Sequence, residues 1–265
     1  MDTPLVSILL PTYNGARYIW EAIDSVLNQD FWNLELIIID DASTDMTGII
    51  LQKYMERDSR IIVLRNEQNL KLVATLNRGL SHARWFYIAR IDDDDIWRDS
   101  SKLSRQLKEF EKNKNLWIVG TGAILIDELG NETGWSISHH GDPIAVRSAF
   151  WLSNQLIHTS IVARKSVLLE AWGYRDDWLY VEDFDLWLRV LALWYEIMNI
   201  AQLSVKYRIR EGNTTNKKYT QMQWLTFRRL FEDKTISPSF LRKWMNLSIR
   251  FILCIFPKWL IRYIK

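Results

Sequence analysis

The sequence predicts an α/β protein in which a mostly parallel central sheet is flanked by helices. Short apolar runs rich in β-branched residues alternate with segments whose apolar residues recur at helical spacing, and the connections between them are short. Strands and helices in this order form right-handed βαβ units, so helices cover both faces of a parallel sheet. The chain has 265 residues, of which 48% are hydrophobic, and is long enough for one large domain with an appendage.

The alternation is clearest in the amino-terminal part of the chain. Strands are predicted at residues 6–10, 34–39, 61–64 and 85–91, and helices at 17–28, 46–54 and 72–80. The turn that begins at Pro11 and contains Gly15 is expected to end the first strand, because both residues favour turns over ladders. The later pattern predicts a strand at 116–126, a turn at 128–131, a helix at 142–151, a strand at 158–164 and a helix from about 182.

Four consecutive carboxylates, Asp92 to Asp95, follow the apolar run at 85–91. Adjacent carboxylates repel one another, so such a cluster at a strand end indicates a neutralising cation. Hard cations prefer oxygen ligands, and Mg²⁺ typically combines one or two carboxylates with substrate phosphates. The cluster therefore predicts a metal-assisted phosphate site, with a solvated acidic loop as the alternative. An EF-hand loop is excluded, because Trp97 stands at its required glycine and Leu103 at its bidentate acid.

Other candidates follow the first two predicted strands, because ligands bind outside the carboxyl ends of the strands in such sheets. Tyr13 offers a flat face for stacking a base, and Asp40 or Asp41 can accept a hydrogen bond from a ring N–H. Ser43 or Asp45 is expected to cap the next helix. The sequence has no G-x-x-x-x-G-K-[ST] motif, and its G-T-G at 120–122 is better explained by tight packing than by dinucleotide binding.

Four motifs in this order resemble the family 2 glycosyltransferases of the GT-A fold. They read VSILLPTYN at 6–14, ELIIIDDASTD at 35–45, ARIDDDD at 89–95 and EDFDLW at 182–187. The resemblance spans about residues 5–210. It implies a GT-A glycosyltransferase domain at 1–215, with a nucleotide-sugar-binding half at 1–115 and an acceptor-binding half at 116–215. A helical C-terminal extension at 216–265 follows.

On the donor side, the resemblance implies that Pro11 and Tyr13 contact the nucleotide base, Tyr13 by stacking, and that Asp41 hydrogen-bonds the base edge. The cofactor implied is Mn²⁺ or Mg²⁺.

The acid cluster corresponds to the D-x-D motif of the family. By that resemblance Asp94 binds the metal, Asp92 binds the metal or the ribose side, and Asp93 shares the ribose contact. If the cluster continued the strand, Asp92 and Asp94 would face one way and Asp93 the other.

The Glu182-Asp183 pair precedes an apolar helical pattern. The resemblance makes Asp183 the general base and Glu182 a hydrogen-bonding neighbour of the acceptor. A carboxylate suits the first role, because an attacking sugar hydroxyl must lose its proton. The alternative is that both acids only stabilise the helix N-terminus. His158 lies beside a position where the family often has a histidine, and a hydrogen-bonded structural role is the more common one for such a residue.

Two departures from the family pattern concern donor contacts. Many relatives carry Tyr-Arg-x-His where this chain has Tyr207-Arg208-Ile209-Arg210, and Arg210 cannot ligate a cation but can pair with a diphosphate. Relatives usually have glycine in the segment that reads NLKL at 69–72, and Lys71 is left outside the predicted site.

The carboxyl-terminal sequence has its own pattern. A helix is predicted around residues 221–231, and Ser237-Pro238 has the form of a helix start. Residues 239–265 contain basic, aromatic and aliphatic side chains without an acid, which is typical of an interfacial helix on anionic lipid. Packing on the protein or on a second subunit is the alternative.

Bulk properties give the expected location. The amino terminus lacks a signal-peptide pattern, no run of 18 uncharged apolar residues is present, and the single cysteine, Cys254, excludes an intramolecular disulfide. We therefore expect a cytoplasmic protein, with residues 239–265 at the inner face of the cell membrane if they bind lipid. The net charge of +2 gives no indication of a nucleic-acid partner.

The predicted function is metal-dependent, inverting transfer of a sugar from a nucleotide diphosphate donor. In relatives the donor is most often a UDP-sugar. The expected acceptor is a saccharide or lipid-linked glycan in cell-surface polysaccharide biosynthesis. The alternatives are a nucleotidyltransferase, which would favour a glycine-rich loop near the amino terminus, and a non-catalytic carbohydrate-binding module. That loop is absent from the sequence.

Overall fold

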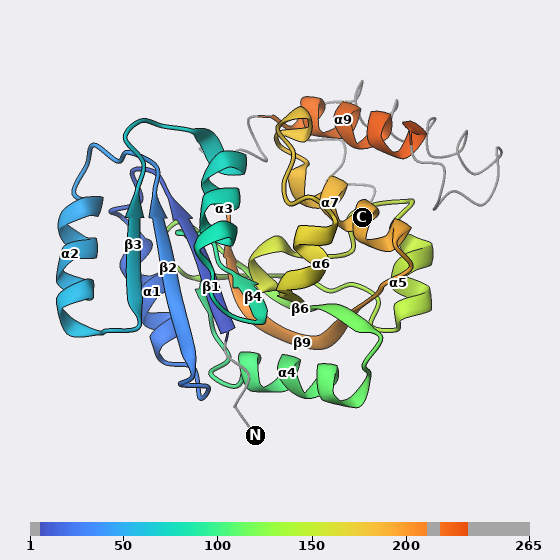
Figure 1. Ribbon diagram of the computed structural model, residues 1–265, viewed down its shortest axis with the longest axis horizontal. Coiled ribbons are helices and arrows are strands. Elements are labelled where there is room, and N and C mark those ends of the chain that lie inside the picture. Colours follow the sequence, from blue (N-terminus) through green and yellow to red (C-terminus); the bar gives the residue numbers. More distant parts are fainter. Residues whose placement is uncertain (1–5, 211–217, 233–265) are drawn as a thin grey trace.

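The computed structural model describes residues 6–210 and 218–232 and confirms the predicted α/β class, with one curled sheet at the centre (Figure 1). The first four strands are β1 (Val6–Thr12), β2 (Leu34–Asp40), β3 (Ile61–Arg65) and β4 (Tyr87–Arg90). The later strands are β5 (Ile96–Trp97), β6 (Leu116–Ile126), β7 (Glu132–Ile137), β8 (Val162–Arg164) and β9 (Glu196–Arg208). Their order in the sheet is β3-β2-β1-β4-β8-β6-β9-β5, and β7 pairs with β6.

Strand direction changes between the two halves of this sheet. The strands β1 to β4 pair in parallel, as predicted from their alternation with helices. Strand β8 is antiparallel to both β4 and β6, and β9 is parallel to β6. The carboxyl ends of β1, β2 and β4 therefore share one edge, which is the edge where ligand-binding residues are expected.

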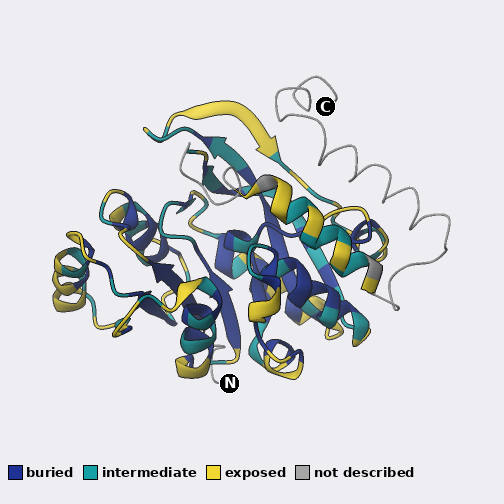
Figure 2. Cartoon of the chain, turned by 90° about the horizontal axis from the view of Figure 1, so that it is seen from above, coloured by how far each residue is buried: buried dark blue, intermediate teal, exposed yellow. Residues whose placement is uncertain are grey.

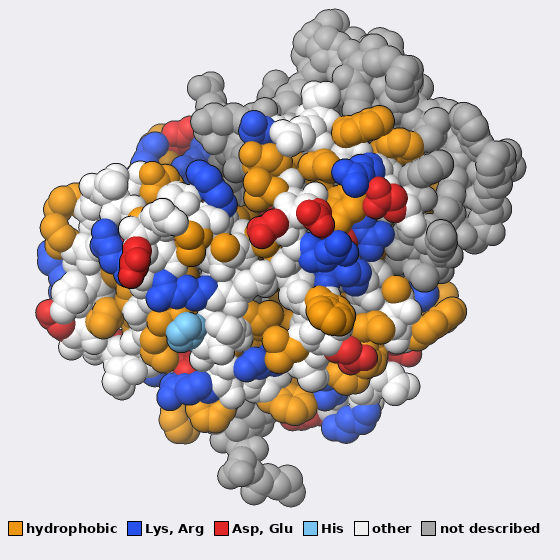
Figure 3. Space-filling model, turned by 45° about the horizontal axis from the view of Figure 1, so that its top comes forward, with side chains coloured by type: hydrophobic (Ala, Val, Ile, Leu, Met, Phe, Trp, Pro, Cys, Tyr) orange, Lys and Arg blue, Asp and Glu red, His pale blue; other side chains and the backbone are white. Residues whose placement is uncertain are grey.

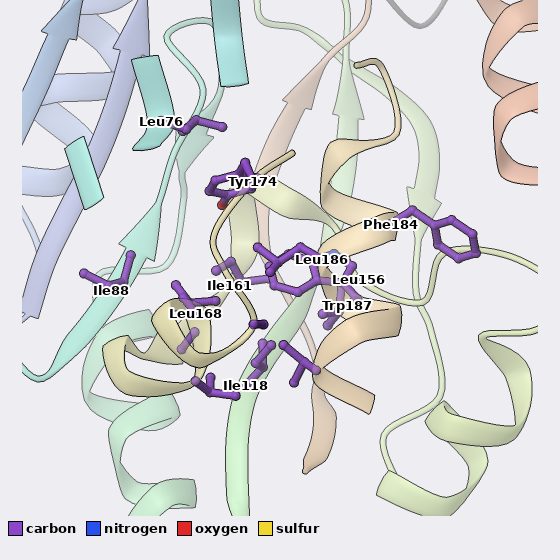
Figure 4. Close-up of a cluster of buried hydrophobic side chains, with 14 of the residues drawn as sticks. Leu76, Ile88, Ile118, Leu156, Ile161, Leu168, Tyr174, Phe184, Leu186 and Trp187 are labelled. Atoms are coloured by element: carbon purple, nitrogen blue, oxygen red, sulfur yellow. The ribbon is translucent and has the colours of Figure 1, made fainter. Parts of the chain in front are cut away.

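Helices cover both faces of the sheet. The helices α1 (Ile19–Leu27), α2 (Thr47–Arg57) and α4 (Lys102–Lys112) pack on one face. The other face carries α3 (Lys71–His82), α5 (Pro143–Ala149), α6 (Lys165–Glu170) and α7 (Glu182–Ala192). Figure 4 shows Leu156, Ile161, Leu186 and Trp187 gathered in the core on that second face. Figure 2 shows the central strands buried, whereas β7 is exposed.

The first strand is longer than predicted, because β1 continues through Pro11 to Thr12. The carbonyl of Leu9 accepts a hydrogen bond from Ile91 N–H on the β4 side. Because backbone polar groups alternate sides along a strand, Pro11 also faces that side, where β4 has already ended at Arg90. The missing N–H ends the pairing with β4 at this point, and β1 continues because its other side still pairs with β2, where Pro11 lies opposite Ile39.

Several other boundaries differ from the prediction. The strand predicted at 158–164 is wrong in its first half: His158–Ser160 is a short 3₁₀ helix, and only Val162–Arg164 is a strand. The short strand β5, the helix α4 and the edge strand β7 were not predicted. In contrast, β6 coincides with the predicted strand, and Gly120 and Gly122 lie within it at sites where a Cβ would collide with side chains of β9, as tight packing requires.

The helix predicted near residues 221–231 is confirmed as α9 (Tyr219–Glu232), and it packs on the face of the sheet that carries α7. The guanidinium of Arg229 donates to Asp185 Oδ1 at 2.5 Å, while Arg189 donates to Asp185 Oδ2 at 2.8 Å. The Asp185 carboxylate, on α7, is fully buried. Helix α9 is thus joined by a buried ion pair to the helix that carries Asp183.

We expect Arg229→Met to destabilise the protein by about 2 kcal/mol, because it leaves the buried Asp185 carboxylate with one guanidinium instead of two. Urea unfolding of the full chain measures this change. Glu232→Gln is the matched control, because its ion pair with Arg228 is exposed and such pairs contribute little. Equal stability of the Arg229→Met and Glu232→Gln variants would contradict a structural role for this ion pair.

None of the helices formed by residues 6–210 and 218–232 combines the length and the apolar character that a bilayer crossing requires. The segment 239–265 and the Ser237-Pro238 helix start lie outside the described residues. On the face drawn in Figure 3, Lys and Arg side chains form several separate groups among hydrophobic and neutral ones.

Candidate active site

The acid cluster forms a turn at the carboxyl end of β4. The strand ends at Arg90, and the N–H of Asp95 donates to the carbonyl of Asp92 at 3.2 Å. The predicted alternation of Asp92, Asp93 and Asp94 therefore does not apply, because alternation holds only while the backbone stays extended. We call residues 92–95 the acid turn.

Each carboxylate of the acid turn has a different partner. Asp92 pairs with Arg90 on β4 through two hydrogen bonds of 2.6 and 3.0 Å. Asp93 accepts from the hydroxyl of Thr12 on β1, Asp94 from Nε of Arg210, and Asp95 from the backbone N–H of Arg208, at 2.6, 2.9 and 2.9 Å respectively. The acid turn thus contacts β1, β4 and the residues at the end of β9.

Burial and mutual repulsion make this turn a poor place for negative charge. Desolvation and the neighbouring Asp94 raise the pKa of Asp93 to about 7. Desolvation and the charge of Asp92 raise the pKa of Asp94, and desolvation with the charge of Asp94 raises that of Asp95 strongly. A cation bound at the acid turn would relieve this repulsion.

Gly15 packs directly against the acid turn. A Cβ at this position would collide with the Asp93 carboxylate and the Thr12 hydroxyl. The sequence identified Gly15 only as a turn residue, but its lack of a side chain is what allows the loop after β1 to approach the acids.

The loops after β1 and β2 are held together by hydrogen bonds. The N–H of Asn14 donates to Ser43 Oγ at 2.9 Å, and Asn14 Oδ1 accepts from the N–H of Thr44 at 2.8 Å. Ser43 therefore links the two loops and is not a helix cap, whereas Asp45 accepts from the N–H of Thr47, the first residue of α2, at 3.0 Å. Tyr13, between these contacts, is 50% exposed and open to a stacking partner.

Asp41 is buried and organises the start of α3. It accepts hydrogen bonds from Asn66 Nδ2, Leu70 N–H and Lys71 N–H at 2.7, 2.8 and 3.0 Å. Lys71 has a φ of 70°, a left-handed conformation that favours glycine, which gives a physical reason for the glycine that relatives have here. Asp40 instead accepts from the N–H of Ser43 and pairs with Arg65, which fixes the loop.

Glu182 and Asp183 occupy the first turn of α7. Asp183 Oδ2 accepts from Asn154 Nδ2 at 2.8 Å, and Oδ1 from the N–H of Phe184 at 2.6 Å. Desolvation and the charge of Asp183 raise the pKa of Glu182 to about 7, and desolvation also raises the pKa of Asp183. Glu182 Oε2 is buried without a hydrogen-bond partner in the described part of the chain. Helix stabilisation alone does not account for a buried carboxylate of this kind.

The positive charge of Arg90 acts on both the acid turn and the α7 acids, Glu182 and Asp183. Sequence reasoning missed this residue. Its side chain is only 3% exposed. Its positive charge offsets part of the rise in the pKa values of Glu182 and Asp183, whereas the negative charge of Asp92 adds to the rise for Asp183. Segments some ninety residues apart thus share one electrostatic environment. A buried arginine at a strand end was visible in the sequence only as a polar residue inside an apolar run.

Arg208 is a second residue that sequence reasoning missed. This buried guanidinium donates to the carbonyl of Asp94 at 2.8 Å and pairs with Glu21 of α1 at 3.0 Å. Its Cζ lies 4.3 Å from the centroid of the Tyr18 ring. Arg208 therefore holds the backbone of the acid turn against α1.

His158 has the structural role that its sequence context favoured. It is partly buried, its Nε2 lies 2.8 Å from the hydroxyl of Tyr174, and its ring contacts that of Trp187 edge-on. Desolvation and the nearby charge of Arg90 lower its pKa well below the usual range, so it remains neutral at physiological pH.

The donor set of the acid turn fits a hard divalent ion that is completed by a substrate. Within the described residues, no group of three or more His, Cys, Asp or Glu side chains could enclose a metal by itself. One or two carboxylates combined with phosphate oxygens are nevertheless the usual ligands of Mg²⁺ at phosphate sites. Asp94 and Asp92 offer such oxygens on a turn where negative charge is disfavoured.

Comparisons with known proteins agree with this geometry. Residues 7–171 match the family model described as Glycosyl transferase family 2. EpsE of Bacillus subtilis (strain 168), which carries a provisional glycosyltransferase name, is 34% identical over 218 residues, covering 81% of this chain and 76% of EpsE. WfaP of Escherichia coli, a UDP-Glc:alpha-D-GlcNAc-diphosphoundecaprenol beta-1,3-glucosyltransferase, is 30% identical over 218 residues, covering 82% of each chain.

A solved structure supports the fold. The mannosyltransferase PcManGT from Pyrobaculum calidifontis, in complex with GDP-Man and Mn²⁺, superposes with a TM-score of 0.72. The match covers 94% of this chain and 70% of that protein at 17% sequence identity. The GT-A architecture expected from the sequence is therefore confirmed.

Proposed function

The chain belongs to glycosyl transferase family 2 and is a glycosyltransferase, and from that premise we propose that it transfers a sugar, with inversion, from a UDP-sugar to a lipid-linked glycan. The observation that supports this proposal is that the charges of Arg90 and Asp92 both act on Asp183, so the acid turn and the α7 acids share one electrostatic environment. The acid turn suits a donor diphosphate bound through a metal ion, and the α7 acids suit proton removal from an acceptor hydroxyl. The lipid-linked acceptor is proposed by analogy with WfaP.

The donor is held by the ends of β1, β2 and β4. Tyr13 stacks on the base beside Pro11, and Asp41, fixed by the start of α3, accepts a hydrogen bond from the base edge. Asp93 and Asp92 lie on the ribose and phosphate side.

Asp94 and Asp92 would hold Mn²⁺ or Mg²⁺, which would supply positive charge to the leaving diphosphate. Arg210 adds a guanidinium for the same group. The PcManGT complex with Mn²⁺ supports use of a divalent ion in this fold.

The chemical step is a single displacement. Asp183, oriented by Asn154 and the N–H of Phe184, removes the proton from the acceptor hydroxyl while Glu182 hydrogen-bonds the acceptor. The hydroxyl oxygen attacks the anomeric carbon from the face opposite the nucleotide, and the bond to the diphosphate breaks. The nucleoside diphosphate leaves, and the anomeric configuration of the transferred sugar is inverted.

The rate should depend on pH through the α7 acids. Because the pKa of Glu182 is raised to about 7 and that of Asp183 is also raised, the pair holds a proton below neutral pH, and kcat/KM should fall as the pH drops below about 7. Glu182→Gln removes the neighbouring negative charge, so Asp183 ionises more readily and the acidic limb should move to lower pH by about one unit. Arg90, Asp92 and Tyr174 also face this pair and are unchanged in the variant.

This shift is read from pH profiles of kcat/KM with one donor and one acceptor, so that substrate ionisation is common to both proteins. Asp177→Asn, in the short 3₁₀ helix Asp176–Trp178 and 75% exposed, should leave the profile unchanged. An acidic limb at the same pH in wild type and Glu182→Gln would overturn the assignment.

Release of free nucleoside diphosphate tests the function itself. The purified full chain is incubated with UDP-Glc, Mn²⁺ and a saccharide linked to diphosphoundecaprenol, and other UDP-sugars follow. We expect UDP release that requires the acceptor. Release of pyrophosphate would instead indicate a nucleotidyltransferase, and donor binding without any release would indicate a binding module.

A further inference from the structure

We propose that Arg210 exchanges partners during the catalytic cycle: it pairs with Asp94 when the site holds neither metal nor donor, and moves to the donor diphosphate when both bind. This inference rests on the proposed function and concerns how metal and donor binding are coupled. It treats Arg210 as a positioning residue that controls access to a metal ligand.

Arg210 and a bound metal ion would compete for Asp94. Arg210 Nε lies 2.9 Å from Asp94 Oδ2, in a charge-assisted hydrogen bond. The side chain of Asp94 is 14% exposed, so water screens this pair only weakly. A divalent ion bound at Oδ2 would lie within a few ångströms of the guanidinium, and the repulsion between the two cations would weaken the pair between Arg210 and Asp94.

Arg208 and Arg210 differ in how firmly the protein holds them. Arg208 is 1% exposed and bound to backbone and to Glu21, so it is fixed in place. Arg210 follows the end of β9, its side chain is 39% exposed, and its Cζ lies 5.8 Å from the centroid of the Tyr18 ring. The guanidinium of Arg210 is therefore accessible to a solvent-borne partner, while Arg208 keeps the acid turn in position.

The donor brings negative charge that can replace Asp94 as the partner of Arg210. A diphosphate brings negative oxygens in the planar spacing that a guanidinium binds through two parallel hydrogen bonds. When Arg210 pairs with the diphosphate, Asp94 becomes available to the metal. Metal binding at Asp94 in turn makes Arg210 available to the diphosphate. Each ligand therefore strengthens the binding of the other, and the coupling must be reciprocal.

The test measures binding and needs no turnover. Mn²⁺ affinity is determined by electron paramagnetic resonance of free Mn²⁺, alone and with saturating UDP, for wild type and Arg210→Gln. For Mn²⁺ alone we expect the variant to bind about tenfold more tightly, which is the effect of removing one competing charged pair. UDP should bind the Mn²⁺-loaded variant about tenfold more weakly, and the gain in Mn²⁺ affinity caused by UDP should be smaller than in wild type.

Arg105→Gln is the matched control, because it removes a half-exposed arginine paired with Asp99, whose side chain is also 14% exposed, outside the acid turn. It should change neither affinity. Arg210→Lys keeps a cation and should give Mn²⁺ affinity between wild type and Arg210→Gln. Mn²⁺ affinity that is unchanged or weakened in Arg210→Gln would overturn the inference. Normal coupling without any sugar transfer would instead count against the proposed function alone.

Discussion

Asp183→Asn is expected to lower kcat at least about 100-fold while leaving UDP-sugar affinity within a factor of about two. Asparagine has the same shape and can still accept a hydrogen bond from the N–H of Phe184, but it cannot take a proton from the acceptor. Steady-state kinetics measure the first effect, and calorimetric titration with UDP and Mn²⁺ measures the second. The split between the two separates a catalytic role from a binding role.

The control for this variant is Asp177→Asn, the same chemical change in an exposed carboxylate before α7. It should keep wild-type kcat and KM. If Asp183→Asn retained wild-type kcat, the base would have to be another group, and Glu182, which is buried in the same turn of α7, would be the first to examine.

Asp94→Asn is expected to reduce activity by about 100-fold or more and to remove its dependence on added Mn²⁺. The substitution takes away a charged oxygen ligand, and the remaining acids of the turn do not replace it, because Asp95 faces Arg208 and Asp93 faces Thr12. Activity titrated against Mn²⁺ provides the measurement. When UDP affinity is measured at increasing Mn²⁺ concentrations, the affinity of the variant should no longer rise with the metal.

Asp99→Asn provides the matched comparison, since Asp99 has the same 14% side-chain exposure and an arginine partner but lies beyond β5. Its Mn²⁺ titration should coincide with wild type. An Asp94→Asn protein with an unchanged Mn²⁺ requirement would place the metal elsewhere and remove the acid turn from the mechanism.

The sequence predicted the fold class because the relevant signals are local. Apolar runs and helical spacing identify β1 to β4 and α1 to α3 without any knowledge of tertiary contacts. The strand β5 has two residues and β7 is exposed throughout most of its length, so neither has the apolar pattern that identifies a strand. Their pairing with β9 and β6 comes from tertiary context, which sequence patterns do not contain.

The candidate site shows the same limit. The acids at 92–94 and 182–183 were visible as motifs, and the structure brings them into one electrostatic environment. Arg90 and Arg208 were missed, because the sequence cannot show that a guanidinium lies buried between segments far apart in the chain. The roles of Tyr13, Asp41 and the other site residues remain predictions.

The ion pair between Arg229 and Asp185 also has a consequence for shortened forms of the protein. A chain cut near the predicted division at 215/216 would lack α9 and would leave a fully buried carboxylate only two residues from the proposed base with half of its compensating charge. Loss of activity in such a truncated protein would then reflect damage to the α7 acids themselves. It would carry no information about whether the missing segment recognises lipid.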